Sequence, residues 1–309
     1  MADALLHIKD AYYFDVPKAL WPNHYQSLDE VPAFLRKAHP DASLEDFHHA
    51  MAGKILIPQA LGGELKNLYE PASGLCISKF MVLEVVVAIF LYVVFNKLAE
   101  RIKDGEVPRG KFWNALEAVL IYVRDEIAHP ALHDDAHRFL PVLWTLFFFI
   151  LGCNLLGIIP WLGAATGSFS VTLSLAAVTF LAGLVVGTFR LGLVGYWKNL
   201  VPHMHLPVWL QPLKLMIFAI ELLGLLIKHG VLGVRLLANM VAGHLVLLAI
   251  LGLIVEAAGG TFGSWAITTF ISVLGSTLFS VLELGVAFLQ AYVFTFLSAL
   301  FISAAVHHH

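Results

Sequence analysis

The sequence predicts an all-α integral membrane protein that crosses the bilayer several times. Of its 309 residues, 59% are hydrophobic and only 13% are charged, about half of the roughly 25% typical of a soluble domain. The mean hydropathy is +0.80. Neither a soluble globular domain nor a disordered chain hides this much apolar surface from water, so a membrane protein with several spans is the class that fits.

Charge and cysteine content exclude two further classes. The net charge of −3 and the isoelectric point of about 6.6 exclude a nucleic-acid-binding protein. Cys76 and Cys153 are too few for a disulfide framework.

The charged residues divide the chain near residue 80. Residues 1–79 hold 7 Lys or Arg and 10 Asp or Glu, whereas residues 139–309 hold only 8 charged residues in 171 positions. We therefore expect a polar N-terminal region (1–79) of short helices and loops, followed by a membrane domain (80–309).

Hydropathy then places the elements in order. Three spans are expected at residues 80–95, 139–160 and 169–189, and a basic linker at residues 97–111. Residues 112–127 place apolar side chains at helical spacing with polar ones on the other faces, which favours an amphipathic interfacial helix over a span.

Two long apolar stretches close the chain, at about residues 213–256 and 262–306. As one helix, each of these stretches is about 65 Å long, twice a bilayer core of about 30 Å. Hydropathy alone would divide each into two spans, and the alternative is one long, strongly tilted helix in each.

Basic residues predict the orientation. Seven Lys or Arg lie between the first two spans, and Arg190 and Lys198 follow the third. The positive-inside rule places these segments in the cytoplasm and the N-terminal region outside. This pattern, with no Arg- and Ser-rich transit peptide, favours a bacterial inner membrane over a mitochondrial one.

Arg235 is the strongest functional candidate. No charged residue occurs in the six positions before it or the twenty after it. An ionisable side chain costs about 2.5–3.5 kcal/mol in the bilayer, and arginine does not lose its proton, so Arg235 needs an anion or water. Glu221 is 14 residues away, about 21 Å along a helix, which leaves Glu283 or a carboxylate of another chain. The alternative is an arginine that snorkels to the interface.

Other polar residues in the apolar stretches have two interpretations. Asn239 shares the stripe of Arg235, whereas His244 lies about 180° around the helix from Arg235, where it could pack between helices. Glu283 and Gln290 share a stripe on the last stretch. Glu283 has the properties of a proton relay group and equally those of a buried structural acid. His203 and His205 have metal-ligand spacing, which is weak evidence for a metal.

Two motifs together resemble subunit a of the rotary F-type ATP synthase. The run Arg235-Leu-Leu-Ala-Asn239-Met-Val-Ala-Gly243-His244 is similar to one signature of that family, and Glu283-x6-Gln290-Ala-Tyr-Val-Phe is similar to the other. The resemblance covers about residues 80–306, with further matches at residues 139–141, 154–160 and 171–175.

The resemblance implies a non-catalytic subunit, without cofactor or metal, whose last two helices form a long, tilted hairpin beside a ring of c subunits. Arg235 would face the carboxylates of that ring. Glu221 would belong to the inner half-channel. The outer half-channel would comprise Asn239, His244, Glu283 and Gln290, with possible access at Asn154, Ser170 and Thr172.

The resemblance also names partners: the c-ring, the b subunits of the peripheral stalk, the rest of the complex and the lipid bilayer. The runner-up function is a secondary ion-coupled transporter, although the sequence shows no internal repeat. A structural scaffold is a third class, and Arg235 argues against it, because a scaffold gains nothing from the cost of an arginine buried in the bilayer. Gly157 stands where some members of the family carry an acid, which weakens a detailed map of the outer channel.

Overall fold

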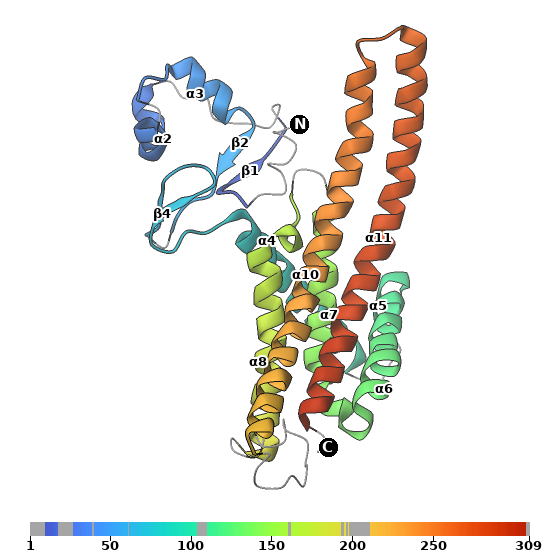
Figure 1. Cartoon of the computed structure of the whole chain (residues 1–309). Helices are drawn as coiled ribbons and strands as arrows, with labels where there is room; N and C mark the ends of the chain where they lie inside the picture. Colours follow the sequence, from blue (N-terminus) through green and yellow to red (C-terminus); the bar gives the residue numbers. More distant parts are fainter. Residues whose placement is uncertain are drawn as a thin grey trace.

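The computed structural model describes residues 10–17, 27–38, 40–60, 62–103, 110–159, 162–192, 195, 197 and 211–306. It consists of a small N-terminal unit at one end of a body of long helices (Figure 1). The N-terminal unit contains β1 (Tyr13–Asp15), η2 (Leu28–Glu30), α2 (Ala33–Ala38), α3 (Leu44–Met51), β2 (Lys54–Leu56), β3 (Glu64–Leu65) and β4 (Pro71–Ser73). The body contains α4 (Lys79–Ile102), α5 (Lys111–Tyr122), η3 (Val123–Ala128), α6 (His129–Leu132), η4 (His133–Asp135), α7 (Ala136–Ile158), η5 (Ala165–Gly167), α8 (Phe169–Leu191), α10 (Gln211–Ala257) and α11 (Phe262–Val306).

The N-terminal unit has a small core of its own and more structure than the expected helices and loops. Antiparallel β1 and β2 pair Tyr13 with Leu56, and β3 pairs with β4 across a bulge. A cluster of four buried side chains lies under α2 and α3: Val31, Leu35, Phe47 and Met51. The sequence did not reveal the strands because two or three residues are too few to show an alternating pattern.

Backbone and ionic contacts attach this unit to the start of α4. The Lys79 amide donates to the Ala11 carbonyl at 2.8 Å, and Lys79 Nζ lies 3.6 Å from Asp15 Oδ2. The Ser78 hydroxyl caps α4 by accepting a hydrogen bond from the Met81 amide. The unit is therefore held at the N-terminal end of α4, while the chain's C-terminus lies at the opposite end of the body (Figure 1).

Five helical stretches are long and apolar enough to cross a membrane, as expected: α4, the continuous run Lys111–Ile158, α8, α10 and α11. In the second of these, α5 passes through the π-helical η3 into α6, and the chain reverses at His133, where φ is +47°. Arg190 at the end of α8 forms an ion pair with Asp135 at the start of α7. The basic end of α8 and the basic start of α7 therefore lie at the same end of the body.

The last two helices are single and unbroken, with 47 residues in α10 and 45 in α11. At 1.5 Å per residue, each is about 70 Å long, so the structure favours one long helix over two spans in each stretch. They lie side by side as an antiparallel hairpin, and the end that carries the connection extends past the other helices (Figure 1).

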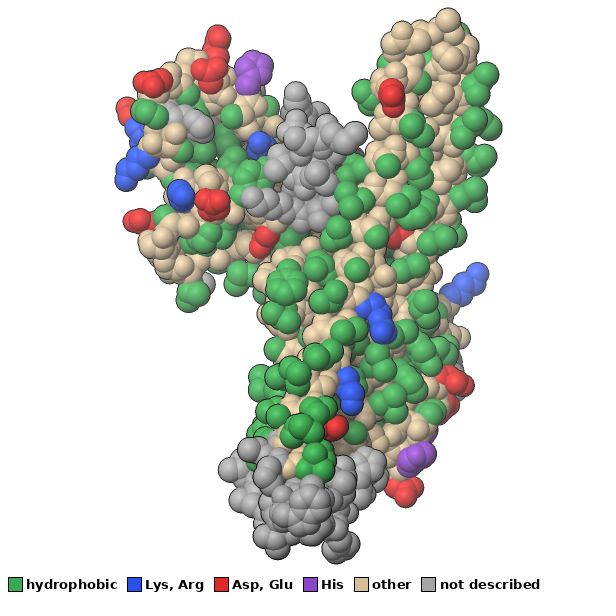
Figure 2. Space-filling model, in the orientation of Figure 1, with side chains coloured by type: hydrophobic (Ala, Val, Ile, Leu, Met, Phe, Trp, Pro, Cys, Tyr) green, Lys and Arg blue, Asp and Glu red, His purple; other side chains and the backbone are tan. Residues whose placement is uncertain are grey.

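Apolar side chains cover much of the surface as well as the core. The main core lies among α7, α10 and α11 and includes Phe147, Leu232, Leu236 and Phe294. Hydrophobic side chains also cover the visible face of the hairpin, whereas charged ones gather on the N-terminal unit (Figure 2). Exposed apolar surface on this scale is typical of helices that face lipid or other membrane helices.

Candidate functional site

Residues 221–240 of α10 have one buried face and one exposed polar stripe. Leu232, Leu236 and Met240 are buried against the other helices. Glu221, Lys228, Arg235 and Asn239, which recur at spacings of 7, 7 and 4, are exposed. The guanidinium of Arg235 forms no ion pair or hydrogen bond with any residue that the structure describes, and the residue is exposed.

Two glycines allow α10 to approach its neighbours closely. A Cβ at Gly233 would lie 2.8 Å from the Thr172 carbonyl oxygen of α8. A Cβ at Gly243 would lie 2.5 Å from Oε1 of Glu283 in α11. Any larger residue at position 243 would therefore displace the Glu283 carboxylate. Sequence reasoning missed this role, although the glycine directly before His244 was a visible signal.

His244 and Glu283 form an ionic pair inside the bundle. His244 Nδ1 lies 3.4 Å from Glu283 Oε1, and Glu283 is only 6% exposed. The two ring nitrogens of His244 also face carbonyl oxygens, Met240 O and Gly157 O, each at 3.1 Å. A neutral imidazole has one N–H and can donate to only one of these carbonyls. The geometry therefore suits a protonated ring with the Glu283 carboxylate as its counter-ion.

Amide side chains continue this polar cluster. Asn239 Nδ2 donates to Gln290 Oε1 at 2.6 Å, which joins α10 to α11. On α7, Asn154 Oδ1 accepts from the Thr166 hydroxyl at 2.8 Å, and its Nδ2 lies 3.4 Å from the Ala287 carbonyl oxygen. Thr166 was not predicted, because it belongs to a short uncharged loop between two spans.

These side chains surround one small cavity of about 20 Å³. Its polar lining comes from Asn154, Asn239, Glu283 and Gln290. About 10–15 Å³ of such space holds one water molecule, provided that the water finds two to four polar partners. Both Glu283 oxygens and Gln290 Nε2 are buried without a hydrogen-bond partner among the described residues. A water molecule in the cavity would therefore find hydrogen-bond partners among these buried atoms.

The structure leaves other predicted residues outside the cluster. Ser170 is exposed and its hydroxyl lies 2.9 Å from that of Ser168, while the Thr172 hydroxyl bonds to carbonyls of its own helix. Glu221 lies on the exposed stripe, about 21 Å from Arg235 by helix rise. Glu283 faces His244 rather than Arg235. His203 and His205 lie outside the described residues.

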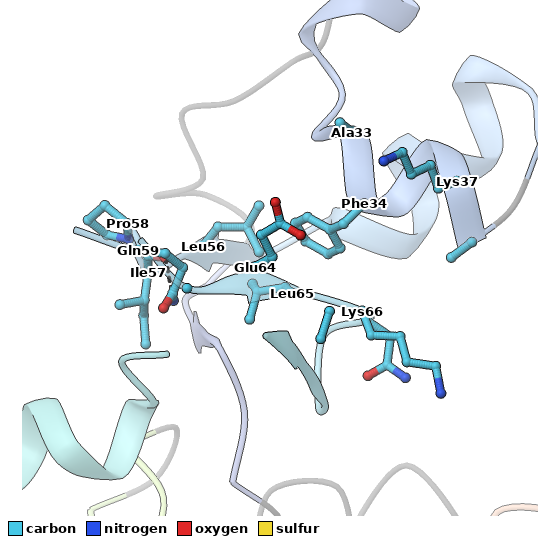
Figure 3. Close-up of a pocket in the computed structure, with 14 residues that line it drawn as sticks. Ala33, Phe34, Lys37, Leu56, Ile57, Pro58, Gln59, Glu64, Leu65 and Lys66 are labelled. Atoms are coloured by element: carbon cyan, nitrogen blue, oxygen red, sulfur yellow. Dashed lines mark hydrogen bonds between the residues drawn. The ribbon is translucent and has the colours of Figure 1, made fainter. Parts of the chain in front are cut away.

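A larger groove lies in the N-terminal unit, between α2, β2 and β3 (Figure 3). Its volume is about 1010 Å³, and none of the predicted site residues lines it. The described residues contain no group of three or more His, Cys, Asp or Glu side chains that could hold a metal ion.

Known proteins are similar to this chain over most of its length. Residues 80–303 match the family model described as "ATP synthase A chain". "ATP synthase subunit a" of Myxococcus xanthus is 40% identical over 252 residues, which cover 80% of each chain. The same-named protein of Chloroherpeton thalassium is 33% identical over 87% of this chain and 79% of its own length. That of Anaeromyxobacter dehalogenans strain 2CP-1 is 46% identical over 67% of this chain but only 52% of its own length.

Proposed function

This chain belongs to the ATP synthase A chain family, and from that premise we propose that it carries protons along two half-channels that are separated by Arg235. As a member of this family it is a non-catalytic, multi-pass membrane subunit of the ATP synthase. The proton path and its residues are the proposal, and the water-sized cavity beside Glu283 is the observation that carries it.

The outer half-channel is formed by the polar cluster between α7, α10 and α11. A proton that enters near Asn154 reaches Glu283, whose oxygens have no hydrogen-bond donor among the described residues. With its ring protonated, His244, at 3.4 Å, stabilises the charge that a departing proton leaves on Glu283. Asn239 and Gln290 then lead to the exposed stripe of α10.

Arg235 separates the two half-channels. Its exposed guanidinium suits a carboxylate of the c-ring, which would be ionised as it passes Arg235 and protonated elsewhere on the ring. Arginine is permanently charged, so it repels a proton that would otherwise cross directly. Each charge that crosses the membrane releases about 2.3 kcal/mol per 100 mV, which drives rotation.

Glu221 supplies the inner half-channel. It lies on the same exposed stripe as Arg235, and the offset of about 21 Å keeps the two openings apart. Ser170 and Thr172 contribute only to proton access to the outer half-channel. The c-ring and the b subunits of the peripheral stalk are the partners, and the location is the inner membrane of a bacterium.

Replacing Arg235 tests the proposal. In inverted vesicles that contain the assembled complex, Arg235→Ala should abolish ATP-driven proton uptake, while Lys228→Ala, a matched exposed cation on the same stripe, should retain most of it. Coupled uptake that survives Arg235→Ala would overturn the proposal. The alternative, a secondary transporter, instead requires the chain alone to move protons when a solute gradient is imposed.

A further inference from the structure

A second groove lies between α4, α5 and α7, at the edge of the main core. Its volume is about 610 Å³, within the roughly 300–1,000 Å³ typical of small-molecule sites. Apolar side chains form most of its walls, among them Leu91, Phe95, Trp144 and Phe149. The Trp144 indole is fixed by a 3.0 Å hydrogen bond to the Leu120 carbonyl, so this wall is rigid.

The two principal walls run antiparallel. Phe95 of α4 meets Phe148 of α7 with ring centroids 5.1 Å apart, whereas a Cβ at Gly152 would contact Val87. Higher numbers on α4 therefore lie opposite lower numbers on α7. The C-terminal end of α4 and the N-terminal end of α7 accordingly form the same end of the groove.

Cations extend both walls at that end. On α4 the lining residues Tyr92, Asn96 and Ala99 are followed, at helical spacing, by exposed Lys103. On α7, exposed Arg138 precedes the lining residues Pro141 and Thr145 by one and two turns. Neither Lys103 nor Arg138 forms an ion pair with a residue that the structure describes.

Other charged residues lie close to Lys103 and Arg138 in the sequence. Lys97 and Arg101 project from the opposite face of α4, and Arg101 lies over the Trp113 ring at 4.7 Å. Glu100 flanks the mouth and offsets one of the two positive charges of Lys103 and Arg138. Residues 97–104 thus contain three cations and two acids, Glu100 and Asp104, and Asp134 precedes Arg138 by four residues.

Among the described lining residues, Asn96 is the only amide, and it lies near this mouth. Asn96 is exposed, and its side chain forms no hydrogen bond with a described residue. The Thr145 hydroxyl is already bonded to the Pro141 carbonyl at 2.8 Å. The groove therefore presents, in order, a cationic mouth, a free amide and an apolar floor.

We propose that this groove binds an anionic phospholipid, with its phosphate between Lys103 and Arg138 and an acyl chain along the apolar walls. Asn96 donates to an ester carbonyl of the glycerol. Basic pockets between membrane helices recognise anionic headgroups in this way, and charge complementarity selects a lipid over an uncharged helix of a partner. The groove shares no lining residue with the cavity beside Glu283, so the site is independent of the proton path.

Brominated lipids that quench tryptophan test the proposal. The complex is reconstituted into nanodiscs that contain phosphatidylglycerol or phosphatidylcholine with identical dibrominated chains. The quenching that disappears in Trp144→Phe reports occupancy of the groove. Phosphatidylglycerol should occupy it in strong preference to phosphatidylcholine, about fivefold for each of the two cations, which is equivalent to about 1 kcal/mol each.

A charge-matched pair of variants supplies the control. Lys103→Gln with Arg138→Gln should remove the preference, whereas Lys97→Gln with Lys111→Gln, which removes two exposed cations outside the groove, should keep it. Subunit composition shows that each variant assembles. Equal quenching by both lipids in the unmodified chain would overturn the proposal, as would quenching by neither, which would mean that a partner helix fills the groove.

Discussion

Exchanging His244 and Glu283 should preserve proton pumping that either single substitution removes. Opposite charges 3.4 Å apart attract by about 5 kcal/mol at an effective dielectric constant of about 20. The side chain of His244 is 19% exposed, so water reduces this value. We expect a coupling energy of about 0.5–3 kcal/mol, the range found for residues in contact, or roughly 2- to 150-fold in rate.

The assay is a double-mutant cycle on the initial rate of ATP-driven proton uptake in inverted vesicles. It compares His244→Glu, Glu283→His and the double exchange, with each rate divided by the amount of assembled subunit. Glu256→Gln, at an exposed acid near the far end of α10, is the control and should leave the rate unchanged. If the double exchange is no faster than the slower single variant, the two side chains do not act as a pair.

Two further predictions concern packing and pH. Gly243→Ala should slow proton uptake about 10- to 100-fold, because its methyl group would lie 2.5 Å from Glu283 Oε1 and move the carboxylate. Gly252→Ala is the control and should leave the rate of uptake unchanged, because a Cβ there meets nothing within 4 Å. Equal rates in the two variants would refute the packing argument. Hydrogen bonds from Ser43 lower the pKa of Asp46 in the capping box of α3. The stabilisation of α3 by this carboxylate is therefore fully present above the unfolded-state pKa of about 3.9. It is lost as the pH falls through the lower pKa of the folded state. Amide exchange in α3, corrected for its intrinsic rate, should therefore accelerate at acidic pH, and Ser43→Ala should weaken this dependence; exchange that is independent of pH would contradict it.

The spans were predictable because membrane crossing depends on a run of apolar residues, which is a property of the chain itself. The start of the third span at residue 169 and the bounds of the last helix at 262 and 306 agree with the structure. The first span runs on to Ile102, into the expected basic linker, because charged residues continue a helix past the apolar region as readily as apolar ones. Hydropathy indicates which residues of a segment lie in the lipid, and says less about where the helix of that segment ends.

Arg235 could be singled out as a candidate from the sequence, because an isolated charge in an apolar stretch is visible without the fold. The strands of the N-terminal unit were not, since three-residue strands have no measurable period. The role of Gly243 and the contact between the Gly157 carbonyl and His244 were equally hidden. They depend on what stands opposite each residue in another helix.

The sequence by itself determined the membrane class and the residues whose charge or polarity is expensive in lipid, whereas the structure decided that each of the last two stretches is one helix. Only the tertiary structure decided which of those residues meet. His244 and Glu283 are 39 positions apart, and Asn154 and Ala287 are 133 apart, yet both pairs are in contact. Helical spacing fixes the angle of a side chain around its own axis, whereas the register and crossing of neighbouring helices determine its partner. Close packing at small residues such as Gly233 and Gly243 sets that register.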